Sequence, residues 1–202
     1  MALKLVTAPT AEPLTLAEVK AHLRVDHTDE DSLIQIYIRA AREWADGPYG
    51  FLGRALVTQI WDLVLDEFPT SEIKIPLPPL ISVDSVRYDD TAGDEQTVSS
   101  LDYYVDKSSE PGWIVPVMSW PSTIDAVNSV RIRFTAGYTP DTSVSPPDQA
   151  ANIPFNIKAG LLLLIGNLFE NREENVAGTI ANKLPFGVDA LLRPHRLQLG
   201  MA

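Results

Sequence analysis

The stretch FNIKAGLLLLIGNLFENRE, residues 155–173, decides how this chain folds. Its residues are apolar nearly all round a helix, which predicts a helix at the centre of its domain rather than on a surface. Gly160 and Gly166 would let another backbone approach this helix closely. The apolar run at 159–169 is shorter than the roughly 18 residues needed to cross a bilayer, so no membrane span is predicted.

Two more helices are predicted near the start of the chain. In LTLAEVKAHLRV (14–25), Thr15 and Glu18 have the spacing of a capping box. A second helix follows DHTDED (26–31), with Thr28 or Asp29 as its cap. Apolar residues of 33–45 cover an arc of roughly 200°, whereas packing on one core needs about 100°. This second helix is therefore predicted to be covered on two sides.

Residues 55–136 read as short strands. The clearest is VRIRFTAGY (130–138), in which apolar residues alternate with Arg131 and Arg133. About five other strands are separated by turn-forming residues, which favours an antiparallel sandwich-like region. We therefore expect an α+β fold in three parts: N-terminal helices (1–54), an inserted antiparallel β region (55–138), and a linker with the central helix and a C-terminal docking segment (139–202). The N- and C-terminal helices are expected to form one bundle.

The last stretch, KLPFGVDALLRPHRLQLGMA (183–202), is apolar and slightly basic. Chain ends usually fray in solvent, so an apolar end needs something to pack against. Two hypotheses remain open: the segment docks on a partner, or it folds back onto its own bundle. The candidate interface residues are Leu184, Phe186, Val188, Leu191, Leu192, Arg193 and Arg196.

The net charge of −11 is unevenly distributed, since residues 62–110 alone carry −9. An acidic body repels nucleic-acid phosphates instead of binding them. With no cysteine, the chain can form neither a disulfide framework nor a thiolate metal site. Its start shows no apolar run of signal-peptide length, so a soluble protein made in a cytoplasm is expected.

No residues have the pattern of a catalytic, cofactor-binding or metal site, so a protein that is not an enzyme is predicted. His22, His27 and His195 are isolated in the sequence. Two weaker alternatives stay open. One is a carbohydrate- or receptor-binding β module with an exposed aromatic platform; the other is a hydrolase using carboxylates of the acidic middle segment. The aromatic residues in question are Trp61, Trp113, Trp120, Tyr103 and Tyr104.

Five stretches, taken in order, resemble the head–tail connector family of long-tailed bacteriophages and gene transfer agents. They are EPLTLAEVKAHLRVDHTDEDSLI (12–34), IPLPPLISVDSVRYDD (75–90), VRIRFTAGY (130–138), IKAGLLLLIGNLFENRE (157–173) and LPFGVDALLRPHR (184–196). The resemblance implies a structural subunit of the adaptor ring beneath the portal in the virion neck. It also implies a helical bundle with a β-rich insertion, and no cofactor.

The implied partners are the portal protein, other copies of the chain in a ring of twelve, and a downstream stopper or tail protein. DNA would pass through the ring without specific binding. The second side of the helix at 33–45 would then face a neighbouring copy through Ile36, Ile38 and Ala45. The C-terminal segment would dock on the portal or on an adjacent subunit. Another neck role, such as a tail-completion or stopper protein, is the nearest alternative.

Overall fold

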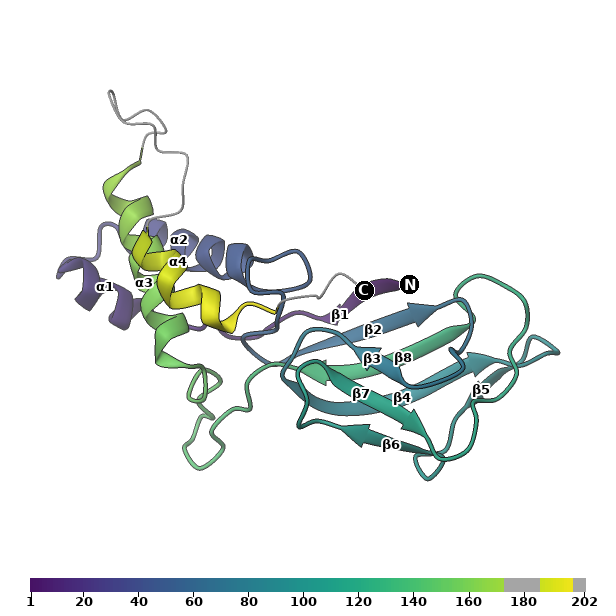
Figure 1. Ribbon diagram of the computed structural model, residues 1–202. Helices are drawn as coiled ribbons and strands as arrows, with labels where there is room; N and C mark the ends of the chain where they lie inside the picture. The colour runs from purple at the N-terminus through teal and green to yellow at the C-terminus, as the bar shows by residue number, and fades with distance from the viewer. Residues whose placement is uncertain (173–185, 198–202) are drawn as a thin grey trace. The chain divides into compact units, whose positions relative to one another are not determined.

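A computed structural model describes residues 1–172 and 186–197, and this part of the chain contains four α-helices and two antiparallel sheets (Figure 1). The mixed α+β class expected from the sequence is therefore confirmed. The chain divides into two compact units. The β unit comprises Met1–Thr10 and Val57–Thr139, and the helical unit comprises Ala11–Leu56 and Pro140–Ala202.

The β unit is built from two antiparallel sheets. The larger sheet has the strand order β1-β2-β8-β4-β5, and the smaller one has the order β3-β7-β6. The strands of the larger sheet are β1 (Ala2–Thr7), β2 (Gln59–Leu65), β4 (Leu80–Asp89), β5 (Glu95–Thr97) and β8 (Val130–Ala136). Those of the smaller sheet are β3 (Ile73–Ile75), β6 (Tyr103–Asp106) and β7 (Gly112–Pro116).

Buried and partly exposed residues alternate along β8, and the buried ones contribute to the core of this unit. Val130, Ile132 and Phe134 are fully buried, while the arginines between them lie on the opposite face of the sheet. The smaller sheet lies over the larger one in Figure 1. The two sheets approach closely at Gly112, where an added Cβ would lie 2.6 Å from Cδ2 of Leu80. Residues of both inner faces thus share one core.

Strands β1 and β5 were not predicted from the sequence. Both are edge strands that pair with one neighbour, β1 with β2 and β5 with β4. Five of the six residues of β1 and all three of β5 are exposed. Because these strands bury little apolar surface, their sequences carry a weak hydrophobic pattern.

The helical unit contains α1 (Leu16–Leu23), α2 (Asp31–Ala45), α3 (Phe155–Glu170) and α4 (Phe186–Leu192), and a 3-10 turn, η1 (Arg193–His195), follows α4. The capping box of α1 is present as predicted: the Glu18 amide donates to Thr15 Oγ1 (3.2 Å), and the Thr15 amide donates to Glu18 Oε2 (2.7 Å). The predicted side-chain cap of α2 is wrong. Glu30 is its N-cap, and Thr28 instead accepts the Asp31 amide through its backbone carbonyl.

Helix α3 contacts α1, α2 and α4, as expected of a central helix. One side of α3, with Ile157, Leu161 and Ile165, is completely covered. The other side is not, since Phe155 and Leu163 are exposed. A helix that is apolar all round therefore keeps part of its apolar surface in solvent in the single chain.

Gly160 of α3 is where α4 comes closest. A Cβ added at this position would lie 2.7 Å from Cδ2 and 2.8 Å from Cγ of Leu192. These distances are shorter than carbon atoms tolerate, so α4 can occupy this place only because residue 160 has no side chain.

Substituting the two glycines of α3 by alanine should change stability in opposite directions. Alanine gains about 1 kcal/mol over glycine in a helix interior. At Gly166 the nearest side-chain atom to an added Cβ is 3.4 Å away, so Gly166→Ala should stabilise the chain by up to ~1 kcal/mol. At Gly160 the clash with Leu192 outweighs that gain, and we expect a net loss of ~1 kcal/mol. Urea unfolding of both variants measures this difference, and equal effects at both sites would contradict the close contact.

Candidate interaction surfaces

Helix α4 buries two of the predicted interface residues within its own chain. Val188 and Leu192 are fully buried, and Leu192 lies against Gly160 of α3. Both residues are therefore unavailable to a partner in this conformation, because α4 has folded back onto the helical unit. Leu191 is half-buried, and Leu184 lies outside the described residues.

The opposite side of α4 and the turn after it are open to solvent. The Phe186 side chain is 87% exposed. Arg193 is exposed and forms an ion pair with Asp189 one turn earlier (2.9 Å from Nε to Oδ2). Arg196 lies over the ring of Phe51, 5.0 Å from its centroid. This side of the segment is therefore apolar at one end and basic at the other.

Two hydrogen bonds, one from a backbone amide and one from a side chain, fix the chain after α4. The Leu197 amide donates to the Leu52 carbonyl (2.8 Å), and Arg54 Nε donates to the His195 carbonyl (2.7 Å). Arg54 is buried, so this last bond is protected from water. The end of the described chain is thus anchored to the turn that follows α2.

The predicted inter-subunit face of α2 is only partly exposed. Ile38 and Ala45 share one stripe of the helix with Ile34 and Ala41, and all four are buried inside the helical unit. Ile36 lies two residues from Ile38, on the other side of the helix, and is 60% exposed. Of this set, Ile36 alone offers a neighbour an apolar contact.

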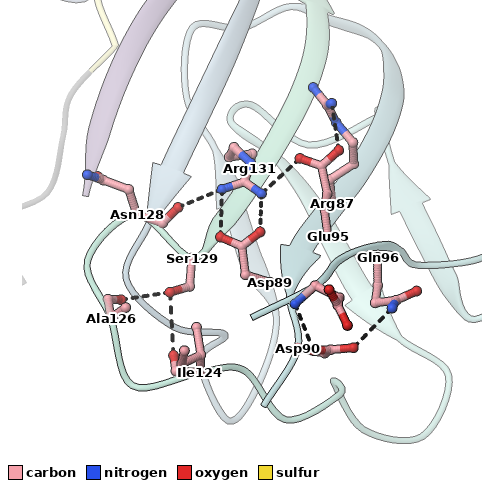
Figure 2. A network of polar contacts seen from close by, with 11 residues as sticks. Arg87, Asp89, Asp90, Glu95, Gln96, Ile124, Ala126, Asn128, Ser129 and Arg131 are labelled. Atoms are coloured by element: carbon pink, nitrogen blue, oxygen red, sulfur yellow. Dashed lines mark hydrogen bonds and ion pairs between the residues drawn. The ribbon is translucent and has the colours of Figure 1, made fainter. Parts of the chain in front are cut away.

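Arginines on the outer face of the larger sheet form ion pairs with carboxylates. Figure 2 shows the Arg131 guanidinium between Asp89 and Glu95; it donates to both carboxylates and to the Asn128 carbonyl. Arg87 donates to the other oxygen of Glu95 (3.2 Å). This hydrogen bonding from Arg131 lowers the pKa of Asp89 below its usual value.

A second pair on this face joins neighbouring strands. Arg133 Nε and Nη2 donate to the two carboxylate oxygens of Asp62 at 2.8 and 2.9 Å. These hydrogen bonds lower the pKa of Asp62, against the burial that would raise it. Each of these strand-to-strand contacts therefore matches an arginine with a carboxylate.

A third surface was not predicted from the sequence. Five large apolar residues at the end of the smaller sheet are exposed, and we call them the apolar patch: Leu101, Tyr104, Val115, Val117 and Met118. A sequence signal for this surface is present in GWIVPV (112–117), where both alternating faces of one strand are apolar.

The aromatic residues do not form one platform for a flat ligand. Trp61 and Tyr103 are buried in the β unit. Trp120 stacks on Phe68 (centroids 4.9 Å apart, planes 4° apart), and its indole N–H donates to the Ser71 carbonyl. Most of these aromatic side chains pack within the β unit, and Tyr104 is the most exposed of them.

The chemistry of the acidic residues gives no support to the hydrolase alternative. A general acid needs a raised pKa. Five aspartates of the described chain have instead a lowered pKa: Asp62, Asp89, Asp90, Asp106 and Asp141. Among residues 1–172 and 186–197, no three potential metal-ligating side chains gather in one place. No helix in that part of the chain is long and apolar enough to cross a bilayer.

The chain was also compared with known proteins. A family model described as phage gp6-like head-tail connector protein matches residues 13–103. Two solved structures match at 26% identity and a TM-score of 0.77, covering 99% of this chain and 98% of theirs. They are the neck of an empty gene transfer agent (GTA) particle computed with C6 symmetry and the virion of a native GTA particle. The resemblance to head–tail connectors is confirmed.

A third structure is the neck of a native GTA particle computed with C12 symmetry. It matches at 24% identity and a TM-score of 0.69, and the match covers 99% of this chain and 98% of that chain. At that identity it supports the connector fold alone. No curated protein sequence gives a significant match. The connector likeness thus extends over both units, whereas the family model ends at the start of β6.

The Asp62–Arg133 pair predicts a specific dependence on pH. The folded-state pKa of Asp62 lies below the unfolded value of about 3.9, so its stabilising effect is complete above that value and is lost as the pH falls through the folded pKa. Asp62→Asn should therefore lower the free energy of unfolding by ~1 kcal/mol at neutral pH and have less effect in strong acid.

Urea unfolding at several pH values between about 7 and 2 measures this difference. Asp125→Asn, at an exposed loop position of the same unit, is the matched control. A loss of stability for Asp62→Asn that stays the same at every pH would contradict the assignment.

Proposed function

We propose that this chain is a structural subunit of the head–tail connector ring in the neck of a phage-like particle and carries out no catalytic step. The observation that carries the proposal is the likeness, over 99% of the chain, to chains of the GTA neck and virion, together with the connector family match. In this role the subunit docks beneath the portal after DNA packaging and provides the surface to which the tail attaches.

The proposed assembly is a ring of twelve copies. A related chain at 26% identity occurs in a neck computed with C6 symmetry, which supports copies arranged around an axis. The N- and C-terminal helices of each subunit are proposed to form the bundle of the connector fold. Within it, Ile36 is proposed to face a neighbouring copy, and Phe186, Arg193 and Arg196 the portal or an adjacent subunit.

The charge of the chain suits a ring through which DNA passes. Twelve copies at −11 each would carry a total charge of about −130, which repels the phosphates of a duplex. Specific DNA binding would need free cations to displace counterions. On the outer face of the larger sheet, Arg87, Arg131 and Arg133 are already paired with carboxylates. The DNA is therefore proposed to pass without adhering.

Removing the chain from particles tests this function. In a producing strain that lacks the gene, we expect DNA-filled heads and separate tails, because the tail has no surface to join. Electron microscopy of purified particles measures the fraction of heads with tails. Normal tail attachment without the chain would overturn the proposal, and loss of DNA packaging itself would assign the chain to an earlier step.

Phe186 should matter for assembly and not for folding. Because its ring is exposed, Phe186→Ser should change the free energy of unfolding by less than about 0.5 kcal/mol. Loss of a buried aromatic anchor at an interface typically costs about 2 kcal/mol or more, so incorporation into particles should fall about thirtyfold. Tyr49→Ser, at a fully exposed ring of the same unit, is the control. Quantitative mass spectrometry of purified particles measures incorporation, and equal incorporation of both variants would contradict the prediction.

A further inference from the structure

The two outer faces of the β sandwich differ in chemistry. Arginines and carboxylates on the outer face of the larger sheet pair with one another. The smaller sheet instead presents the apolar patch, in which Tyr104 is 68% and Met118 92% exposed. Outer faces of antiparallel sheets are normally polar. The patch residues are exposed, whereas Ile60 and Val64, on the face of the ion pairs, are half-buried.

The residues of the apolar patch lie at one end of the β6–β7 ladder. Tyr104 of β6 is directly opposite Val115 of β7 in the antiparallel ladder. The Val117 amide donates to the Asp102 carbonyl (2.9 Å), which brings the end of β7 beside Leu101. Contiguous exposed apolar residues rimmed by polar ones are typical of protein–protein contacts.

Folding of the β unit does not require the apolar patch. The inward-facing residues of the same strands, Tyr103 and Ile114, are the ones buried in the core. Tyr104 and Val115 lie on the opposite side and contribute little to it. The patch residues are therefore available for a contact with a partner.

Carboxylates outnumber basic side chains in and beside the β6–β7 hairpin. Asp102, Asp106 and Glu110 lie there, together with Lys107 and, on the neighbouring strand β3, Lys74, which lies over the ring of Trp113. Hydrogen bonds from Ser109 and the Ser108 amide lower the pKa of Asp106, so it stays ionised at neutral pH. A partner that fits this surface has an apolar side chain accompanied by basic ones.

The chain itself carries such a surface on α4 and η1. Phe186 begins α4 on the side opposite the buried Val188 and Leu192, and Arg193 of η1 is exposed and paired with Asp189. Arg196 follows on the exposed turn. Contacts that close a ring join two different surfaces of each copy, so a complementary pair on one chain is what a ring requires.

We propose that the apolar patch of one copy receives the α4–η1 segment of the next copy in the connector ring. Phe186 packs on Tyr104 and Met118, and Arg193 and Arg196 approach the carboxylates of the β6–β7 hairpin. Edge strand β1, with Lys4, Leu5 and Val6, is a weaker candidate because it offers no aromatic side chain. This inference rests on the proposed function, since it names the contact by which the ring forms.

Cross-linking between singly substituted full-length chains tests the contact. The natural chain has no cysteine, so Tyr104→Cys and Phe186→Cys each carry one thiol, and both sites are exposed enough to leave folding intact. The two variants are mixed at high concentration with a short bismaleimide, and the products are identified by mass spectrometry. Mixtures of Tyr104→Cys with Tyr49→Cys and of Val127→Cys with Phe186→Cys are the controls, because both control sites are highly exposed.

We expect the 104–186 product to form at least about tenfold faster than the control products and the homodimers, since a specific contact raises the effective concentration of the two thiols. Added salt should slow this product, because charge complementarity contributes to the contact. Met118→Ser in the Tyr104→Cys chain should also slow it. Equal rates for all pairs would overturn the inference, as would preferential linkage of the Phe186→Cys chain to portal protein added to the mixture.

The two proposals fail in distinguishable ways. If the natural chain is present in necks and the 104–186 product shows no preference, the connector function stands and this contact is wrong. If particles lacking the chain still attach tails, the connector function itself is wrong, whatever the cross-linking rates.

Discussion

The helical unit depends on the close contact between Gly160 and Leu192. Because residue 160 has no Cβ, α4 lies directly on α3 and buries Val188 and Leu192 there. The residues after α4 are then held by hydrogen bonds to Leu52 and from Arg54. This anchoring fixes which side of α4 meets solvent. The exposure of Phe186 and Arg193, on which the proposed assembly depends, is thus a consequence of one helix–helix contact.

In the proposed ring, charge is the second constraint on how copies of the chain associate. Each chain carries −11, so identical surfaces repel one another at low ionic strength. The ion pairs on the outer face of the larger sheet reduce the number of free arginines without adding net charge. Contacts between copies must therefore combine apolar burial with a local match of opposite charges. The exposed side of α4 and the apolar patch meet that condition together.

Sequence analysis predicted the helices and strands whose buried residues recur at a regular spacing. It missed the strands that bury few residues. The capping box of α1, the alternation of β8 and the central α3 were found because each rests on a local rule. Edge strands β1 and β5 bury too little to leave such a pattern. The wide apolar arc of α2 gave no means of distinguishing the exposed Ile36 from the buried Ile38. Composition alone does not show which side of a helix is covered by the rest of the same chain. Of the two hypotheses for the C-terminal segment, folding back describes the buried side of α4, and docking on a partner stays a prediction for its exposed side.

In the proposed role the subunit meets its copies at the portal, and the apolar patch is suited to this order of assembly. It consists of a few side chains beside an acidic hairpin, so the attraction between two free chains is small against the mutual repulsion of chains that each carry −11. On a symmetric template, neighbouring copies are held at high effective concentration, and the same weak contact becomes sufficient. A stronger, uncharged patch would favour association in solution, where heterologous contacts can grow into open chains instead of closed rings. On the proposed arrangement, the acidic hairpin therefore limits assembly to the place where the ring is needed.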